Sequence, residues 1–122
     1  KEKGIYENTI IIFSSDNGPT YLGGVDYDYY ESSKPFSNGY GRTKGFVYEG
    51  GIRVPLIVSW PNHIKPGTNS EHISAFYDLM PTISDLAGIP PPYSIDGISF
   101  KSTLIDQEQL QHQNAHISSY AI

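Results

Sequence analysis

The sequence predicts an α/β fold, a fragment of a mainly parallel sheet flanked by helices. Residues 9–15 are predicted to form a strand, with an unbroken apolar stretch rich in β-branched side chains at residues 10–13, and residues 54–60 are predicted to form a second strand. Residues 78–87 carry apolar side chains at helical spacing. An unbroken apolar strand is typical of a parallel sheet that helices cover on both faces, so we expect the first strand to be buried on both faces.

The segments around the first strand are predicted from their glycine and polar content. Residues 1–8 are predicted to be the end of a helix, with Gly4 as its stop signal. A natural domain seldom begins in this way, so we expect the chain to be a fragment of a longer protein. Residues 18–45 are predicted to be a long loop, dense in Gly, Tyr, Ser and Asp, that forms a wall of an active site.

The predicted helix at residues 78–87 has recognisable ends. Asp78 is the predicted N-cap, and Gly88 follows the last turn. Five apolar residues are predicted to form its buried face: Leu79, Met80, Ile83, Leu86 and Ala87. The last part of the chain is rich in Gln and His and has little periodicity. We therefore divide the chain into residues 1–104 and an atypical, poorly ordered tail at residues 105–122.

The composition argues against several classes of function. The 122 residues carry a formal net charge of −5 without a basic cluster, which argues against a nucleic-acid partner. Because the sequence contains no cysteine, this stretch has no disulfide framework, no thiolate zinc site and no cysteine nucleophile. No apolar run approaches the roughly 20 residues that a membrane span needs.

Asp16, Asn17 and Gly18 directly follow the first predicted strand. In open α/β sheets, ligands bind beyond the carboxyl ends of the strands. One carboxylate and one amide oxygen side by side suit a hard cation such as calcium, which takes oxygen ligands. The alternative is an ordinary turn, because Asp, Asn and Gly all favour turns.

A second motif, rich in glycine, extends over residues 41–55 and contains Lys44. A lysine provides a compact point charge for an oxyanion, and the neighbouring glycines allow the backbone to approach a ligand closely. The alternative is that Lys44 is solvated, that Glu49 and Arg53 form a local ion pair, and that the glycines only turn the chain.

The histidines and the loop tyrosines carry weaker signals. No histidine falls in a metal-binding spacing, and we expect no catalytic role for any of the four: His63, His72, His112 and His116. Five tyrosines of the long loop could stack on sugar rings or pack the loop on its sheet, and packing is favoured for most of them: Tyr21, Tyr27, Tyr29, Tyr30 and Tyr40.

Taken together, the two motifs resemble the later part of a sulfatase catalytic domain of the arylsulfatase type, within the alkaline phosphatase superfamily. Five blocks in the order of the family carry the resemblance, at residues 5–19, 44–55, 60–61, 78–88 and 96–100. These blocks extend over most of the first 104 residues. The resemblance therefore implies an alkaline-phosphatase-like fold.

The resemblance also implies hydrolysis of sulfate esters by a formylglycine nucleophile, with a calcium ion that holds the sulfate. By similarity, Asp16 and Asn17 would be two of the calcium ligands, and Lys44 would be a catalytic residue that binds a sulfate oxygen. The other side chains of the second motif would support the Lys44 segment: Tyr48, Glu49 and Arg53. The substrate would be a sulfated small molecule or glycan, and the protein would be periplasmic, secreted or lysosomal.

The formylglycine motif of the family does not occur in the 122 residues, and calcium takes about six to eight oxygen ligands. We therefore expect the isolated chain to bind calcium weakly and to be inactive. We also expect it to self-associate through an uncovered apolar sheet edge. Two alternatives stay open: a phosphoester hydrolase of the same superfamily, and a binding domain without catalytic activity.

Overall fold

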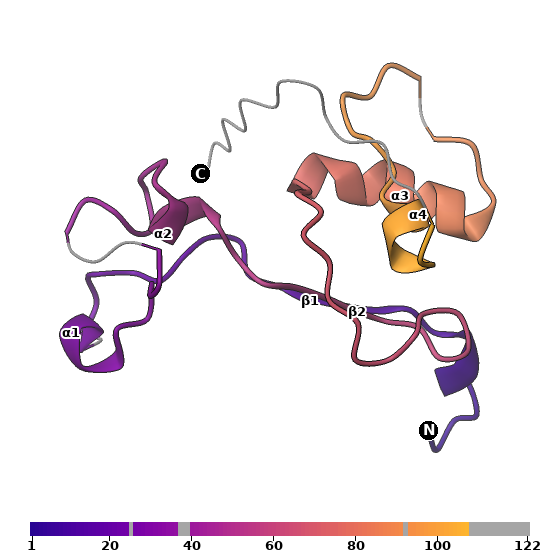
Figure 1. The fold of residues 1–122 in the computed structure, drawn as a ribbon, viewed down its shortest axis with the longest axis horizontal. Coiled ribbons are helices and arrows are strands. Elements are labelled where there is room, and N and C mark those ends of the chain that lie inside the picture. Colours follow the sequence, from indigo (N-terminus) through magenta and orange to yellow (C-terminus); the bar gives the residue numbers. More distant parts are fainter. Residues whose placement is uncertain (25, 37–39, 92, 108–122) are drawn as a thin grey trace. The chain divides into compact units, whose positions relative to one another are not determined.

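The computed structural model describes residues 1–24, 26–36, 40–91 and 93–107 (Figure 1). Long loops connect two strands (β), four short α-helices (α) and two 3₁₀ turns (η) in this part of the chain. The elements in chain order are η1 (Tyr6–Asn8), β1 (Ile11–Ser14), α1 (Tyr27–Tyr30), α2 (Glu49–Ile52), β2 (Leu56–Ser59), η2 (Phe76–Asp78), α3 (Leu79–Ala87) and α4 (Lys101–Leu104). Most of the predicted tail, from residue 108 onward, lies outside the described residues.

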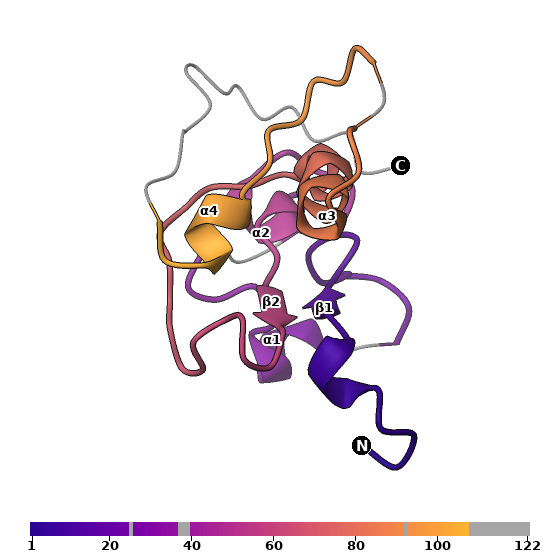
Figure 2. The same cartoon turned by 90° about the vertical axis from the view of Figure 1, so that its right-hand side faces the viewer.

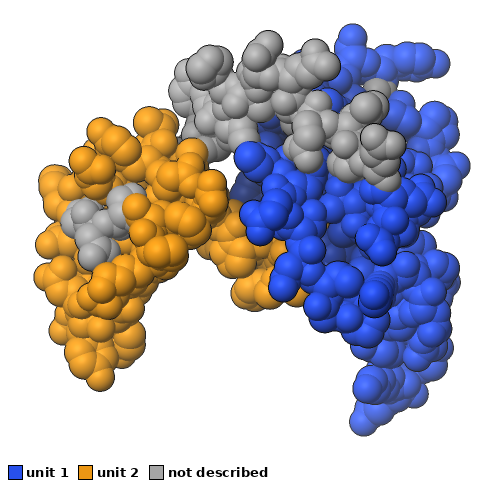
Figure 3. All heavy atoms as spheres, viewed as in Figure 1, with its two compact units in different colours: residues 1–11, 58–117 blue, residues 12–57, 118–122 orange. Residues whose placement is uncertain are grey.

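The described residues divide into two compact units (Figure 3). Apart from the gaps given above, the first unit comprises residues 1–11 and 58–107, and the second comprises residues 12–57. The first unit contains α3 and α4. The second unit contains α1, α2 and both motifs that the sequence singles out, so the candidate site can be described within a single unit.

β1 and β2 form a two-stranded antiparallel sheet, and each strand is shorter than predicted. Pro55, which has no N–H to donate to a neighbouring strand, directly precedes β2, and its carbonyl oxygen accepts a hydrogen bond of 2.8 Å from Ser14 Oγ. The predicted parallel arrangement is not confirmed. Parallel pairing needs a long crossover, usually a helix, whereas the described connection between the strands contains only the four-residue helices α1 and α2.

The prediction that the first strand is buried on both faces is wrong for this structure. Ile11 and Phe13 of β1 are exposed, Phe13 at 61%, and so are Leu56 and Ile57 of β2. The sheet that the described residues form has only two strands of four residues each, so it offers little surface on which other elements can pack. The predicted self-association depends on this exposed apolar surface, and the association itself stays a prediction.

α3 has nearly the predicted ends. It begins one residue after its predicted start, and Gly88 ends it with a φ of 69°, a left-handed conformation that costs glycine little. Asp78 precedes the helix as predicted, but its carboxylate does not cap α3. The carboxylate accepts hydrogen bonds of 2.8 Å from the Ala75 N–H and from the Ile98 N–H. Asp78 therefore joins two loop segments of the first unit.

The buried face of α3 differs from the predicted apolar face. Met80 is 54% exposed and Ile83 is also exposed, whereas Pro81 and Thr82 are buried. In Figures 1 and 2, α4 and the segment that leads into it lie beside α3. This segment presents backbone N–H groups to the helix, so a side chain that can accept hydrogen bonds occupies the contact face. The prediction of an apolar buried face is therefore wrong for Met80 and Ile83, because the segment that packs against α3 contacts a polar side chain instead.

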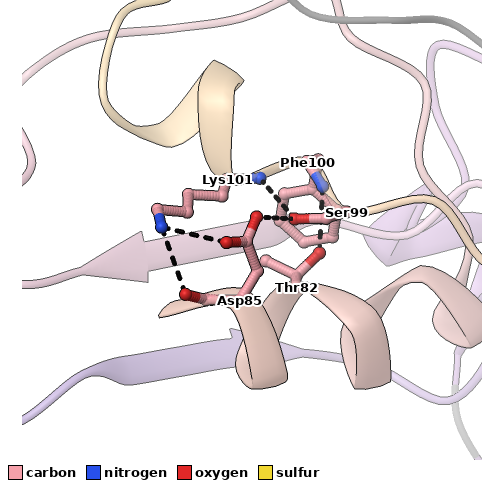
Figure 4. Close-up of polar contacts among 5 residues, drawn as sticks. All are labelled: Thr82, Asp85, Ser99, Phe100 and Lys101. Carbon is pink, nitrogen blue, oxygen red and sulfur yellow. Dashed lines mark hydrogen bonds and ion pairs between the residues drawn. The ribbon is translucent and has the colours of Figure 1, made fainter. Parts of the chain in front are cut away.

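Two polar side chains of α3 hold the segment that leads into α4 (Figure 4). Thr82 Oγ1 accepts a hydrogen bond of 3.0 Å from the Phe100 N–H. The Asp85 carboxylate accepts one of 3.0 Å from Lys101 Nζ and one of 2.9 Å from Ser99 Oγ. The hydrogen bond from Lys101, followed by that from Ser99, lowers the pKa of the Asp85 carboxyl below its ordinary value of 3.8. Asp85 is therefore ionised at neutral pH and keeps both bonds.

The amino-terminal segment and the long loop contain more local structure than a loop prediction implies. The predicted helix end at residues 1–8 is wrong: Gly4, with a φ of 68°, closes a turn through a hydrogen bond from its N–H to the Lys1 carbonyl oxygen, and the single 3₁₀ turn η1 follows it, so Gly4 does not end a helix. The loop at residues 18–45 contains α1, whose N-cap Asp26 accepts a hydrogen bond of 2.9 Å from the Tyr29 N–H. Within the described ranges, no helix has the length and apolar character that a membrane crossing requires.

Candidate active site

The turn after β1 carries the two predicted metal ligands. Asp16 is exposed, and Asn17 is half-buried. Ser15 Oγ donates a hydrogen bond of 2.8 Å to the Asn17 carbonyl oxygen, and Asn17 Nδ2 donates one of 2.8 Å to the Gly18 carbonyl oxygen. Both bonds connect residues within the turn, so short-range contacts help to define its shape.

Two backbone hydrogen bonds join this turn to the second motif. The Gly18 N–H donates to the Gly51 carbonyl oxygen at 2.8 Å, and the Lys44 N–H donates to the Pro19 carbonyl oxygen at 3.0 Å. The two motifs are distant in the sequence but adjacent in the second unit. Such adjacency is required if the two motifs are to serve one site.

The close approach at this junction requires glycine. A Cβ atom on Gly18 would lie closer than 3.0 Å to the Gly50 carbonyl oxygen. A Cβ atom on Gly51 would also lie closer than 3.0 Å to the carbonyl oxygens of Thr43 and Phe46. The sequence predicts that glycines near Lys44 allow backbone to approach a ligand. In the structure, Gly18 allows the turn to approach the backbone of the second motif, and Gly51 allows the second motif to fold closely on itself.

Asn17 and Lys44 line the same hollow, which has a volume of about 740 Å³. Both side chains come from the second unit, so the hollow lies within one compact body. Asp16 is not among the described residues that line the hollow, and it occupies an exposed position next to Asn17. The structure therefore brings the predicted lysine and amide together and leaves the predicted carboxylate at the surface.

The hollow is cationic although the chain as a whole has a net charge of −5. Lys34, Lys44 and Arg53 line it, and its described lining contains no Asp or Glu. Arg53 forms an ion pair with Glu49 across one turn of α2, as the alternative interpretation of the motif expects. Lys44 is exposed, which that interpretation also expects. Exposure alone does not separate the two interpretations, so the role of Lys44 stays a prediction.

The oxygen donors of the turn fit a calcium ion in kind. Asn17 uses its amide nitrogen in the bond to the Gly18 carbonyl oxygen, so the amide oxygen is the atom that can bind a cation. The exposed Asp16 carboxylate provides a second hard donor. Within the described residues, no group of three or more His, Cys, Asp or Glu side chains could hold a metal ion. Since calcium takes about six to eight oxygens, a complete site needs ligands besides these two.

Sequence reasoning missed the part of the hollow that Lys34 and Phe36 line. Both residues lie in the loop at residues 18–45, which is predicted only as a wall of the site. The small number of cations in the loop could have pointed to Lys34, because it is one of only three Lys or Arg residues at positions 18–45. Sequence alone does not indicate which cation of a flexible-looking loop faces the site.

The loop tyrosines divide into packed and exposed groups. Tyr27 is buried, and its ring centroid lies 5.0 Å from that of Tyr21, so these two rings pack within the loop, and packing of the loop on the sheet stays a prediction. The other three loop tyrosines are exposed: Tyr29, Tyr30 and Tyr40. Tyr40 still contacts the Tyr21 ring edge-on, with centroids 5.6 Å apart.

The described histidines, His63 and His72, lie near aromatic rings. The ring of His63 is stacked on that of Trp60 with a centroid distance of 3.8 Å and an interplanar angle of 20°. The ring of His72 lies 6.1 Å from that of Phe100. His112 and His116 lie outside the described residues. The expectation that none of the four is catalytic stays a prediction.

Fold and site together describe an α/β protein with a cationic hollow at the end of a strand, next to oxygen donors that suit a hard cation. The sulfatase family model matches residues 1–89, and the chain belongs to the sulfatase family. Membership of this family implies the alkaline-phosphatase-like α/β fold that the sequence predicts.

Individual sulfatases show the same relationship. Arylsulfatase A of Homo sapiens is 38% identical over 104 residues, which make up 84% of this chain and 19% of that protein. N-acetylgalactosamine-6-sulfatase of Mus musculus is 35% identical over 109 residues, 88% of this chain and 20% of that protein. A sulfatase of Formosa agariphila is 38% identical over 117 residues, which make up 91% of this chain and 19% of that protein. The chain spans about a fifth of the length of these relatives.

Substitution of Gly18 by alanine should separate the turn from the lysine segment. The added Cβ would overlap the Gly50 carbonyl oxygen, and backbone cannot move aside as a flexible side chain can. We expect hydrogen–deuterium exchange at the Lys44 amide, which donates a hydrogen bond to the Pro19 carbonyl oxygen, to be faster in the Gly18→Ala variant than in the unsubstituted chain.

Gly45→Ala is the matched control. Gly45 has a φ of 89°, so alanine there is strained, but an added Cβ meets no atom within 4 Å. We expect the control to keep the protection at Lys44. Equal protection in both variants would show that the close approach at Gly18 does not position the lysine segment.

Proposed function

We propose that the complete protein containing this chain is a calcium-dependent sulfatase that hydrolyses the sulfate ester of a sulfated small molecule or glycan. One observation carries the proposal: Asn17 and Lys44, from two motifs that match the sulfatase family, line a single cationic hollow. The proteins that this chain is similar to are named arylsulfatases and sulfatases, which supports the same reaction class.

Each residue has a definite role in this proposal. Asp16 and Asn17 would contribute two oxygen ligands to calcium, which would stabilise negative charge on the group being transferred. Lys44 would bind a sulfate oxygen through its ammonium group. Its backbone N–H is already bonded to the Pro19 carbonyl oxygen, so the start of this side chain is fixed before substrate binds. Preorganised charge of this kind is often the largest contribution to catalysis.

The chain would supply only part of the active site. A formylglycine nucleophile and the further calcium ligands would come from parts of the complete protein beyond these 122 residues, whose own sequence contains no cysteine. We therefore propose that the isolated chain is inactive. The chain itself would bind and orient the sulfate through Lys44 and would hold one side of the cation site.

Comparison of an aryl sulfate with the matching aryl phosphate tests the reaction class. We expect the complete protein to show the higher kcat/KM for the sulfate ester, because the family resemblance is to sulfatases. A clear preference for the phosphate would instead support the phosphoester hydrolase alternative. Hydrolysis of neither ester would support a binding domain without catalytic activity.

Substitution of Lys44 by alanine tests its role in the complete protein. Loss of one preorganised charged donor should lower kcat by about 10²–10³-fold. Lys65→Ala is the control, because Lys65 is exposed in the first unit and is not among the described residues of the hollow. We expect the control to keep normal turnover. Normal turnover in Lys44→Ala as well would show that Lys44 is a solvated surface charge.

Removal and return of calcium tests the cation site. Treatment with a calcium chelator should abolish sulfate hydrolysis, and calcium should restore it. Asp16→Asn should raise the calcium concentration needed for half-maximal activity by about tenfold or more, since ligand charge sets calcium affinity. Asp28→Asn, an exposed aspartate of α1, is the control and should leave that concentration unchanged. Full activity in the presence of the chelator would contradict the proposed calcium dependence.

A further inference from the structure

The backbone around Lys34 is held in place from both sides. The Lys34 N–H donates a hydrogen bond of 2.9 Å to the Glu31 carbonyl oxygen, and the Phe36 N–H donates one of 3.0 Å to the Ser33 carbonyl oxygen. Ser33 is buried, and its hydroxyl shares a hydrogen bond with the hydroxyl of the buried Tyr27. Lys34 therefore extends from an anchored segment, in spite of its place in a long loop.

A second contact connects this segment to the motif that contains Lys44. The Arg53 guanidinium lies over the Phe36 ring, 4.9 Å from its centroid. Arg53 and Phe36 both line the hollow, as do Lys34 and Lys44. The two lysines are thus carried by connected parts of one unit, and both line the same hollow.

The hollow is larger than one sulfate group needs. Its volume of about 740 Å³ lies within the roughly 300–1,000 Å³ of pockets that hold drug-sized ligands. A ligand of that size has room for a second charged group. The three cations of the lining, without a described acidic partner in the lining, favour a second group that is negative.

The ion pair of Lys34 does not remove it from use. Lys34 pairs with Glu31, and their side chains are 51% and 50% exposed. Exposed pairs of this kind contribute little to stability, because water and salt screen them. Glu31 is not among the described residues that line the hollow. An anion inside the hollow can therefore replace Glu31 as the partner of the Lys34 ammonium.

We propose that Lys34 binds a second anionic group of the substrate, a carboxylate or a second sulfate, while Lys44 binds the sulfate that is removed. The inference rests on the proposed sulfatase function and adds a substrate class, namely sulfate esters with at least one further negative charge. A lysine suits either anion, because its ammonium is a compact charge with three rotatable donors.

The test compares three aryl sulfates in the complete protein. One carries no other charge, the second carries a ring carboxylate, and the third carries a ring sulfonate, which has the charge of a sulfate but is not hydrolysed. We expect the unsubstituted protein to have the lower KM for the doubly charged substrates. We expect Lys34→Gln to raise their KM about tenfold relative to that of the singly charged substrate, the size of one charge-assisted bond, with similar kcat.

Two further variants separate anion binding from a structural role. Glu31→Gln breaks the same ion pair but keeps the lysine, so it should leave the KM for the doubly charged substrates unchanged or lower it. Lys34→Arg should have a KM for the doubly charged substrates close to that of the unsubstituted protein, since arginine keeps the positive charge. The carboxylate and sulfonate substrates show separately which anion the site accepts. A higher KM of Lys34→Gln for either one supports the inference.

The possible failures are distinct. Equal KM changes in Lys34→Gln and Glu31→Gln, or equal changes for all three substrates, would overturn the role of Lys34 and leave the sulfatase function standing. The role of Lys34 would also be overturned, and the sulfatase function would stand, if the unsubstituted protein cleaved the singly charged ester and the doubly charged esters equally well. Failure to hydrolyse any of the three esters would overturn the proposed function, and this inference with it.

Discussion

The hydrogen bond from the Gly18 N–H to the Gly51 carbonyl oxygen is the contact on which the candidate site depends. A backbone hydrogen bond contributes only about 0.5–1.5 kcal/mol net, so the bond alone does not hold the junction. The absence of a side chain at Gly18 lets the strand-end turn come into direct backbone contact with the lysine motif, and the absence of one at Gly51 lets that motif fold closely on itself. That contact brings Asn17 and Lys44 to one hollow. The placement of these two side chains is therefore a consequence of close backbone packing.

The electrostatics of the hollow are local. The chain carries a net charge of −5, yet three cations line the hollow: Lys34, Lys44 and Arg53. Two of them, Lys34 and Arg53, form exposed ion pairs with acidic residues that are not in the described lining. An acidic protein can in this way present a positive surface to an anionic ligand. Global charge is a poor guide to the sign of a site.

Sequence patterns located both strands and the longest described helix but not the neighbours of these elements. The ends of α3 follow from local chemistry, since Gly88 is a left-handed C-cap that any helix of this length can use. Asp78 illustrates the limit. Its sequence position predicts a cap, whereas its carboxylate bonds to Ala75 and Ile98, and the second of these lies 20 residues away. A capping pattern cannot report a competing donor that only folding brings near.

The sequence by itself determined the family, the two motifs and the position of the main helix, because these depend on residue type and short-range spacing. Only the tertiary structure decided that β1 and β2 pair in antiparallel fashion, that α3 buries a polar face, and that Lys34 reaches the hollow. The physical reason is the same in each case. Strand direction, buried face and side-chain access depend on which distant backbone packs alongside, and residue periodicity contains no record of that partner.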